Sequence, residues 1–469
     1  MNRLAAKHYY ETFVIALIVT LLPYRALGYL VPAFCLIWYL IRSKSGNTLK
    51  RLVIITLVYT VIITFYVILN QITGTDFLTS NAAVSLLTYG SFIFILLIEG
   101  DFVRYEHSYE KYARILSYAT LIQGLVGIFQ FTIVALTGRF DIIPGDAVQG
   151  TIGLLTFVGG EPGFGNQMLA INLVFFLVFL IPNVLVHRRG IGSFLIGLIA
   201  LMLAGVLHIF ISLVFSAIVT LFLYRRNLIF SNIGRLISAV VLAILLILPL
   251  GIIFPGVFTT ANIFITLYSN QDSPKFEVVN RTVIDMPQEY PHVYLVGLGP
   301  GQYLSRAGLM SSGKYFDQYV PFFSNTISEP MKEYGYSIWN AYSSNTNRFG
   351  NSTMHRPFFS LLSIFAEFGL VFLIALFIYL IVLVYKMRKA YLRYRSNQQY
   401  QSAYLSFGVG LSFVFLLSIS FFDNYLETTQ AIFPGLLLVK AFYSSLRTSA
   451  FAQILPDKVE HKQQLLSRA

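Results

Sequence analysis

Residues 357–385 read PFFSLLSIFAEFGLVFLIALFIYLIVLVY, and this stretch decides the class of fold. Its one charged residue is Glu367. A helix needs about 20 predominantly apolar residues to cross the hydrocarbon core of a membrane, and this run is long enough. We therefore expect a transmembrane helix here. The cost of burying Glu367 predicts a partner for its carboxylate, with arginine the natural candidate.

Similar apolar runs recur along the whole chain. Its 469 residues are 56% hydrophobic and 12% charged, whereas soluble domains carry roughly 25% charged residues. The sequence therefore predicts an all-α polytopic membrane protein. Outer-membrane barrels are excluded, because their strands alternate between polar and apolar residues. The net charge of +12 predicts basic cytoplasmic loops rather than a nucleic-acid partner.

We expect about twelve transmembrane helices. Their predicted limits are 9–24, 26–41, 52–71, 82–99, 115–136, 163–186, two spans that share 191–224 and meet near His208, 236–257, 357–385, 403–421 and 429–446. With both termini in the cytoplasm, the basic clusters between spans all lie inside, and the short outer loops hold only Arg25 and Arg139. The predicted organisation is spans one to nine in 1–257, an extracytoplasmic loop with short helices in 258–356, spans ten to twelve in 357–446 and a cytoplasmic tail in 447–469.

The segment 258–356 is the long polar stretch of the chain, and we call it the polar segment. It carries Arg281, Arg306 and Arg356 although we expect it on the outer face. Long loops are partly exempt from the positive-inside trend, so one interpretation is a solvated basic face. The other is a site for an anionic ligand at the membrane surface, because a guanidinium group binds phosphate oxygens in a bidentate manner.

Three further features are candidates for chemistry, each beside a simpler interpretation. Gly297, Gly299 and Gly301 form either a loop turn or a close approach of the backbone to a ligand. His355, at the entrance to a span, is either a surface histidine or an acceptor for a hydroxyl proton. Glu161, at the start of the sixth span, either caps a helix or presents a carboxylate to a sugar hydroxyl or an arginine. The sequence shows no cluster with metal-site spacing and no ATP-binding loop, so we expect no cofactor.

Together these features resemble the bacterial O-antigen polymerase and O-antigen ligase superfamily, which contains Wzy-type polymerases and WaaL-type ligases. The shared features are about twelve spans, a long loop between the ninth and tenth, an arginine early in it (Arg281), the turn Gly297 to Gly301, the histidine His355 before a span, and Glu367-Phe368-Gly369 within that span. Glu161-Pro162-Gly163 resembles the Glu-Pro-Ser segment of exopolysaccharide repeat-unit polymerases. One departure is that Leu207 to Ser212 lacks the arginine that ligases and many polymerases carry between spans seven and eight.

The resemblance implies a GT-C-type fold and an inverting, metal-independent glycosyltransferase of the bacterial inner membrane. Donor and acceptor would be glycans on undecaprenyl pyrophosphate. Further partners would be the membrane lipid and a protein that regulates chain length. The resemblance also implies that Arg281 holds the donor pyrophosphate and that His355 serves the acceptor. Because these groups share the outer face, our hypothesis is that Arg306 or Arg356 assists Arg281 and that Glu161 is the alternative to His355. The remaining predicted substrate-binding residues are Arg25, Glu367, Gly297, Gly299 and Gly301.

Two other functions stay open at this point. An O-antigen ligase, which transfers the glycan from its carrier to the lipid A core, shares every feature except the resemblance of Glu161-Pro162-Gly163 to polymerases. A lipid-linked oligosaccharide transporter belongs to a different class. Transporters of that kind usually show two related halves, and this chain has one dominant loop and no visible halves.

Overall fold

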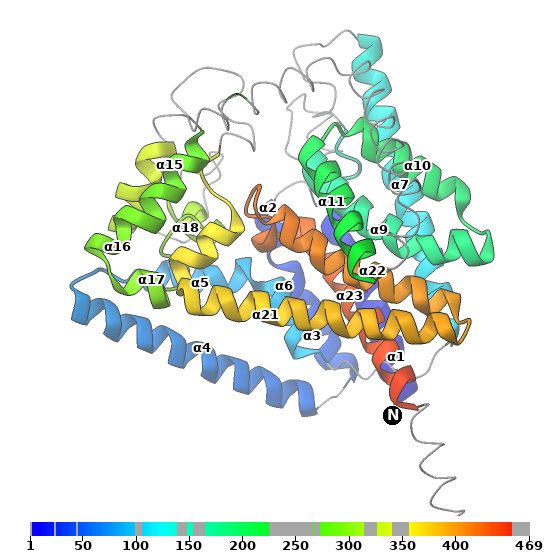
Figure 1. Cartoon of the computed structure of the whole chain (residues 1–469), viewed down its shortest axis with the longest axis horizontal. Helices are drawn as coiled ribbons and strands as arrows, with labels where there is room; N and C mark the ends of the chain where they lie inside the picture. The colour runs from blue at the N-terminus through cyan, green and yellow to red at the C-terminus, as the bar shows by residue number, and fades with distance from the viewer. Residues whose placement is uncertain are drawn as a thin grey trace, which may run out of the picture.

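The computed structural model describes residues 2–22, 25–43, 46–98, 106–137, 148–152, 165–224, 266, 273–313, 326–339 and 356–452. Within these ranges every regular element is a helix, and no strand occurs. The all-α prediction is therefore confirmed for this part of the chain. Figure 1 draws its helices as coloured ribbons.

Six described helices are long and apolar enough to cross a membrane, or seven if one bent pair forms a single span. They are α4 (Gly46–Thr73), α7 (Glu106–Thr137), α9 (Gly165–His187), α11 (Leu207–Tyr224), α21 (Ser360–Ser396) and α22 (Tyr400–Ile419). They support the predicted membrane class. The number of twelve stays a prediction, and the expected span 236–257 lies outside the described residues.

Other helices, most of them shorter or bent, occupy further predicted spans. These are α1 (Asn2–Ala16) with the 3-10 helix η1 (Leu17–Leu21), α2 (Arg25–Gly28), α3 (Val31–Ser43), the pair α5 (Thr79–Thr88) and α6 (Gly90–Leu97), and α23 (Thr429–Ala452). The axes of α5 and α6 meet at 61°. Length alone therefore does not decide how these elements cross a bilayer.

The run 191–224 forms two helices, as the sequence predicts. The first, α10 (Ile191–Leu203), ends before Gly205, which has a φ of 65°. A residue in this left-handed conformation ends a right-handed helix, and glycine adopts it without steric cost. The next helix, α11, begins at Leu207, so His208 lies in its first turn, close to the predicted meeting point.

Burial separates central from peripheral helices. In the apolar 18-residue window of each helix, 72% of α9 and 61% of α22 are buried, against 6% of α4 and 11% of α21. Figure 1 shows α4 at the lower edge of the molecule and α21 running above it. Helices that are apolar all round are either buried or membrane-facing. We therefore expect lipid to cover the exposed faces of α4 and α21.

The described part of the polar segment folds into short helices with their own apolar core. They are α15 (Pro274–Asn280), the π-helix η3 (Arg281–Asp285), α16 (Met286–Glu289), α17 (His292–Val296), α18 (Arg306–Ser311), α19 (Glu329–Met331) and the π-helix η4 (Lys332–Tyr336). Their buried residues, such as Leu304 and Met331, form one cluster with Phe358 and Leu362. Figure 1 shows helices α15 to α18 at the N-terminal end of α21, beside α5.

A break in α21 joins the polar segment to this helix. Gly369 has a φ of 75° and a ψ of 176°, so the helical ladder is interrupted there. Such a break deprives the preceding carbonyl groups of their helical donors. The carbonyl oxygens of Ala366 and Glu367 instead accept hydrogen bonds from the N–H groups of Leu298 and Gly299, each at 2.9 Å. The glycine turn therefore completes the backbone hydrogen bonding of α21.

Close backbone contact explains why glycines are needed in this turn. A Cβ atom on Gly297 would lie 2.3 Å from the carbonyl carbon of Glu367, and one on Gly301 would lie 2.3 Å from the carbonyl oxygen of Asn81. The backbone of the glycine turn thus approaches other parts of the chain closely, namely the backbone at Glu367 and at Asn81. Whether these glycines also bind substrate stays a prediction.

The carboxylate of Glu367 is fully buried at the same break. Its Oε2 accepts a hydrogen bond from the N–H of Gly301 at 2.8 Å, and its Oε1 accepts one from the N–H of Tyr303 at 3.1 Å. Among the described residues, backbone N–H groups and the hydroxyl of Ser305 therefore take the place of the arginine that we expected as its partner. Glu367 holds the glycine turn onto α21.

Candidate functional site

A buried cluster of charged side chains lies where the polar segment meets the ends of α21, α22 and α23. Arg306 begins α18, Arg356 precedes α21, and Asp423 lies in the turn between α22 and α23. Their exposed fractions are 1%, 3% and 0%. Charged residues are almost never buried this deeply unless they are paired.

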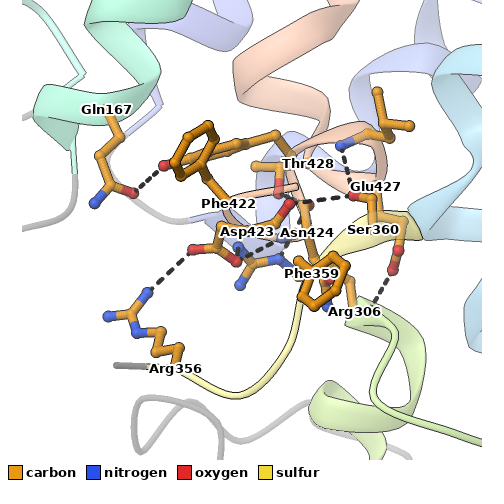
Figure 2. Close-up of polar contacts among 12 residues, drawn as sticks. Gln167, Arg306, Arg356, Phe359, Ser360, Phe422, Asp423, Asn424, Glu427 and Thr428 are labelled. Atoms are coloured by element: carbon orange, nitrogen blue, oxygen red, sulfur yellow. Dashed lines mark hydrogen bonds and ion pairs between the residues drawn. The ribbon is translucent and has the colours of Figure 1, made fainter. Parts of the chain in front are cut away.

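Asp423 is the counter-charge that both arginines share. Its Oδ1 accepts a hydrogen bond from Nη2 of Arg306 at 3.1 Å, and its Oδ2 accepts one from Nη1 of Arg356 at 3.3 Å. Figure 2 shows Asp423 facing both guanidinium groups. Burial opposes ionisation of Asp423, but the charges of Arg306, Arg356 and Lys275 outweigh it and lower its pKa. The carboxylate is therefore ionised at neutral pH.

Lys275, in the first turn of α15, is a third cation at this site. It is 5% exposed, and its Nζ donates a hydrogen bond to the carbonyl oxygen of Phe422. Burial is the main cause that lowers the pKa of Lys275 to about 7, although the negative charge of Asp423 opposes it. Near neutral pH this amine is therefore divided between its charged and neutral forms.

Hydrogen bonds to the polar segment hold the turn that carries Asp423. The side-chain amide of Asn424 donates to the carbonyl oxygen of Leu304 at 2.6 Å. The Oε2 of Glu427 accepts from the backbone N–H of Arg306. Burial raises the pKa of Glu427, so this carboxyl is held towards its neutral form. The turn and α18 are thus fixed to each other.

Helices α11 and α9 bring uncharged polar side chains to the same turn. The Nε2 of His208 lies 2.7 Å from the Oη of Tyr425, and this hydroxyl donates to Oε1 of Gln167 at 3.0 Å. The rings of His208 and Tyr425 are stacked, with centroids 5.9 Å apart. The cluster therefore has a charged part around Asp423 and an uncharged part around Tyr425.

The structure brings together two of the arginines that the sequence predicts as site residues, Arg306 and Arg356. Arg281 is elsewhere: its side chain is 41% exposed on η3 and pairs with Glu277 at 2.7 Å. Glu161, His355 and the side chain of Arg25 lie outside the described residues. The roles assigned to these residues stay predictions.

Comparisons of the chain with family models, curated proteins and solved structures find no match.

Several members of the cluster have no role in the sequence analysis. They are Lys275, Gln167, Asp423 and Tyr425. One signal was present, because Asp423 and Glu427 are two acidic residues in a short stretch between apolar runs. Ionisable residues at membrane depth are functional candidates. Lys275 shared the signal of the other basic residues in the polar segment, but its position beside Asp423 comes from packing. Gln167 carries no comparable signal.

Three basic side chains share the carboxylate of Asp423. Burial lowers the pKa of Arg356 to about 10, so it is still cationic at neutral pH. Arg306 and Arg356 pair with this carboxylate directly, and the charge of Lys275 also acts on it. Such a site suits a ligand with phosphate groups. No described group of three or more His, Cys, Asp or Glu side chains is arranged to hold a metal ion.

Replacing Lys275 by methionine is expected to remove a pH dependence of stability. The folded-state pKa near 7 lies below the ordinary value of 10.5, so the unfolded chain binds more protons between these pH values. The free energy of unfolding should therefore rise from pH 7 to pH 9 more steeply in the wild type than in Lys275→Met, by at most about 1.4 kcal/mol per pH unit. Reversible unfolding in mixed micelles at pH 7, 8 and 9 measures this difference.

Lys332→Met is the matched control for this experiment, because Lys332 is exposed in the same segment. It should keep the steeper slope of the wild type. Equal slopes in the wild type and in Lys275→Met would contradict the prediction.

Proposed function

We propose that this protein polymerises oligosaccharide repeat units linked to undecaprenyl pyrophosphate at the outer face of the bacterial inner membrane. It would be an inverting, metal-independent glycosyltransferase whose product is O-antigen, capsule or exopolysaccharide. One observation carries the proposal: three buried basic side chains, Arg306, Arg356 and Lys275, converge near Asp423 at the ends of apolar helices.

The location of the cluster suits a substrate on a lipid carrier. Arg356 lies just before α21, and the opposite half of this helix carries the basic residues Lys386, Arg388, Lys389, Arg393 and Arg395. Basic residues mark the cytoplasmic ends of spans. This favours the outer side for the cluster, at the depth of a pyrophosphate whose lipid chain stays in the membrane.

The cluster would act on the leaving group. When an acceptor hydroxyl attacks the anomeric carbon of the donor, the bond from that carbon to the pyrophosphate oxygen breaks, and this oxygen gains negative charge. Arginines that Asp423 already holds in place can stabilise this charge without reorganising. By fixing the pyrophosphate they also orient the anomeric carbon for attack. Arg281 pairs with Glu277, so it can bind the donor as predicted only if this ion pair breaks.

The first test is a gel of surface glycan and lipid-linked intermediates from cells that lack the gene. Single repeat units attached normally, with no long chains, are the expected result. Long chains left on the carrier lipid would instead assign a ligase. Repeat units retained on the inner leaflet would assign a transporter, and the roles given above to the arginines would then be wrong.

A reconstituted assay then tests the site. Vesicles that contain the purified protein and undecaprenyl-pyrophosphate-linked repeat units should yield a ladder of polymers. Arg356→Gln should slow this reaction by about 100-fold, as does the loss of one preorganised electrostatic contact to a transition state. Lys332→Gln, at an exposed position of the same segment, should react at the wild-type rate. A folded Arg356→Gln protein with the wild-type rate would exclude this site.

A further inference from the structure

His208 is an ionisable side chain that the proposed donor site does not use. It lies in the first turn of α11, directly after the helix break at Gly205, and is 7% exposed. An ionisable group buried at membrane depth costs free energy and is a functional candidate. Its contacts indicate what it could do.

The hydrogen bonds of Tyr425 assign the tautomer of His208. Tyrosine has one hydroxyl proton, and Tyr425 donates it to Oε1 of Gln167. The hydroxyl can therefore only accept from His208, so Nε2 of the imidazole carries the proton at their 2.7 Å contact. In the neutral ring, Nδ1 then keeps a free lone pair. Among the described residues no hydrogen bond reaches this nitrogen.

The surroundings of His208 connect it to the arginine cluster. Its ring lies 5.3 Å from that of Phe422, whose carbonyl oxygen accepts the hydrogen bond from Lys275. Lys275 and Asp423 are the charged groups that act on the imidazole, from α15 and from the turn after α22. Tyr425, its direct partner, follows Asp423 by two residues and donates its N–H to the carbonyl oxygen of Asp423 at 2.8 Å.

We infer that His208 takes the proton of the acceptor hydroxyl, with Nδ1 as the accepting atom. This inference rests on the proposed function. The oxygen of the acceptor forms a bond to the anomeric carbon of the donor, and its proton moves to Nδ1. The bond from the anomeric carbon to the pyrophosphate breaks, and its electron pair leaves with the pyrophosphate that Arg306 and Arg356 hold. The proton later passes from the imidazolium to water.

Tyr425 and Gln167 are positioning residues in this scheme. The hydroxyl of Tyr425 accepts from Nε2–H of His208 and so keeps the lone pair on Nδ1. Gln167 orients that hydroxyl, because its Oε1 accepts the hydrogen bond that the hydroxyl donates. Burial and the charge of Lys275 oppose the imidazolium, whereas the carboxylate of Asp423 stabilises it once it forms. General base catalysis by His208 uses the lone pair on Nδ1 of the neutral ring.

The test is single-turnover transfer by the reconstituted full-length protein between pH 3 and pH 9, with saturating undecaprenyl-pyrophosphate-linked donor. The wild-type rate should fall on the acid side, as His208 becomes protonated. His208→Gln should lower the rate by about 100-fold and abolish this acid limb. Its affinity for undecaprenyl pyrophosphate and its melting temperature should match those of the wild type, because a structural role would change both.

Three further variants isolate the effect. Tyr425→Phe should lower the rate by about tenfold and move the acid limb to another pH, because it removes the acceptor for Nε2–H. Lys275→Met should keep the acid limb, since loss of charge on Lys275 acts as pH rises rather than as it falls. His292→Gln is the matched control: neither ring nitrogen of this histidine of α17 has a hydrogen bond among the described residues, and the variant should behave as the wild type.

The inference and the proposed function fail in different ways. If the wild type forms no polymer from the donor, the proposed function is wrong and the inference falls with it. If Arg356→Gln is slow while His208→Gln keeps both its rate and its acid limb, only the inference is overturned. If the acid limb is lost in His355→Gln but kept in His208→Gln, the residue that accepts the proton of the acceptor hydroxyl is His355. If His208→Gln does not fold, an unchanged acid limb in Tyr425→Phe would overturn the inference.

Discussion

Replacing Asp423 by alanine is expected to lower the free energy of unfolding by about 3–5 kcal/mol. The substitution leaves the guanidinium groups of Arg306 and Arg356 buried without the carboxylate that both contact. An uncompensated buried charge costs more than the loss of an exposed ion pair, because water cannot solvate it. Reversible unfolding of the purified protein in mixed micelles measures the change.

Two comparisons sharpen this prediction. Asp285→Ala, at an exposed position of the polar segment, should change stability by less than about 0.5 kcal/mol. Adding Arg306→Met to Asp423→Ala should restore part of the loss, because it removes one of the unpaired charges. A loss below about 1 kcal/mol in Asp423→Ala, or no recovery in the double variant, would show that the arginines are not held by this carboxylate.

Asp423 also predicts the direction of an acid effect. Its pKa is lower in the folded protein than in the unfolded chain, where it lies near 3.9. The stabilisation is therefore complete above about pH 4 and is lost as pH falls through the folded-state pKa. The difference in stability between the wild type and Asp423→Ala should shrink on acidification below about pH 4.

Replacing Gly369 by alanine is expected to cost about 4 kcal/mol. Its φ of 75° and ψ of 176° lie in a region that residues with a Cβ atom rarely enter, at a cost of about 1–3 kcal/mol. In addition, the new Cβ atom would lie 2.2 Å from the carbonyl oxygen of Leu295. Relieving such a contact costs about 1–3 kcal/mol more. The same unfolding measurement in mixed micelles tests this expectation.

Gly297→Ala probes the same contact from the other side, because its Cβ atom would meet the carbonyl group of Glu367. Since either change separates the glycine turn from α21, the double variant should lose less than the sum of the two single losses. Gly192→Ala is the control: nothing lies within 4 Å of a Cβ atom there, and alanine in a helix is neutral or stabilising. A loss below about 1 kcal/mol for both turn variants would mean that the break in α21 does not need this contact.

The local features of the fold were predictable from particular residues. The apolar run 357–385 predicted α21, and the run 191–224 predicted two helices with a break close to His208. These features depend on hydrophobicity and backbone preference within one stretch, so they need no knowledge of distant residues. The bend between α5 and α6 and the break at Gly369 were not predicted, because both lie within apolar runs that would suit straight helices.

The partner of Glu367 illustrates the limit of such predictions. Its burial correctly indicated that the carboxylate needs hydrogen-bond donors, but the donors are N–H groups of Gly301 and Tyr303, more than 60 residues away in the chain. An arginine and a set of backbone N–H groups satisfy a carboxylate equally well in principle. Which of them is present depends on the element that packs against α21.

The sequence by itself determined that this chain is helical and membrane-associated, that its polar residues gather in one long segment, and that arginines of that segment could bind an anion. Only the tertiary structure decided which arginines act together. Arg306 and Arg356 lie 117 and 67 residues from Asp423 along the chain, and His208 lies 217 residues from Tyr425. The reason is physical: apolar length and backbone preference act locally, whereas the pairing of buried charges is set by how distant helices pack around them.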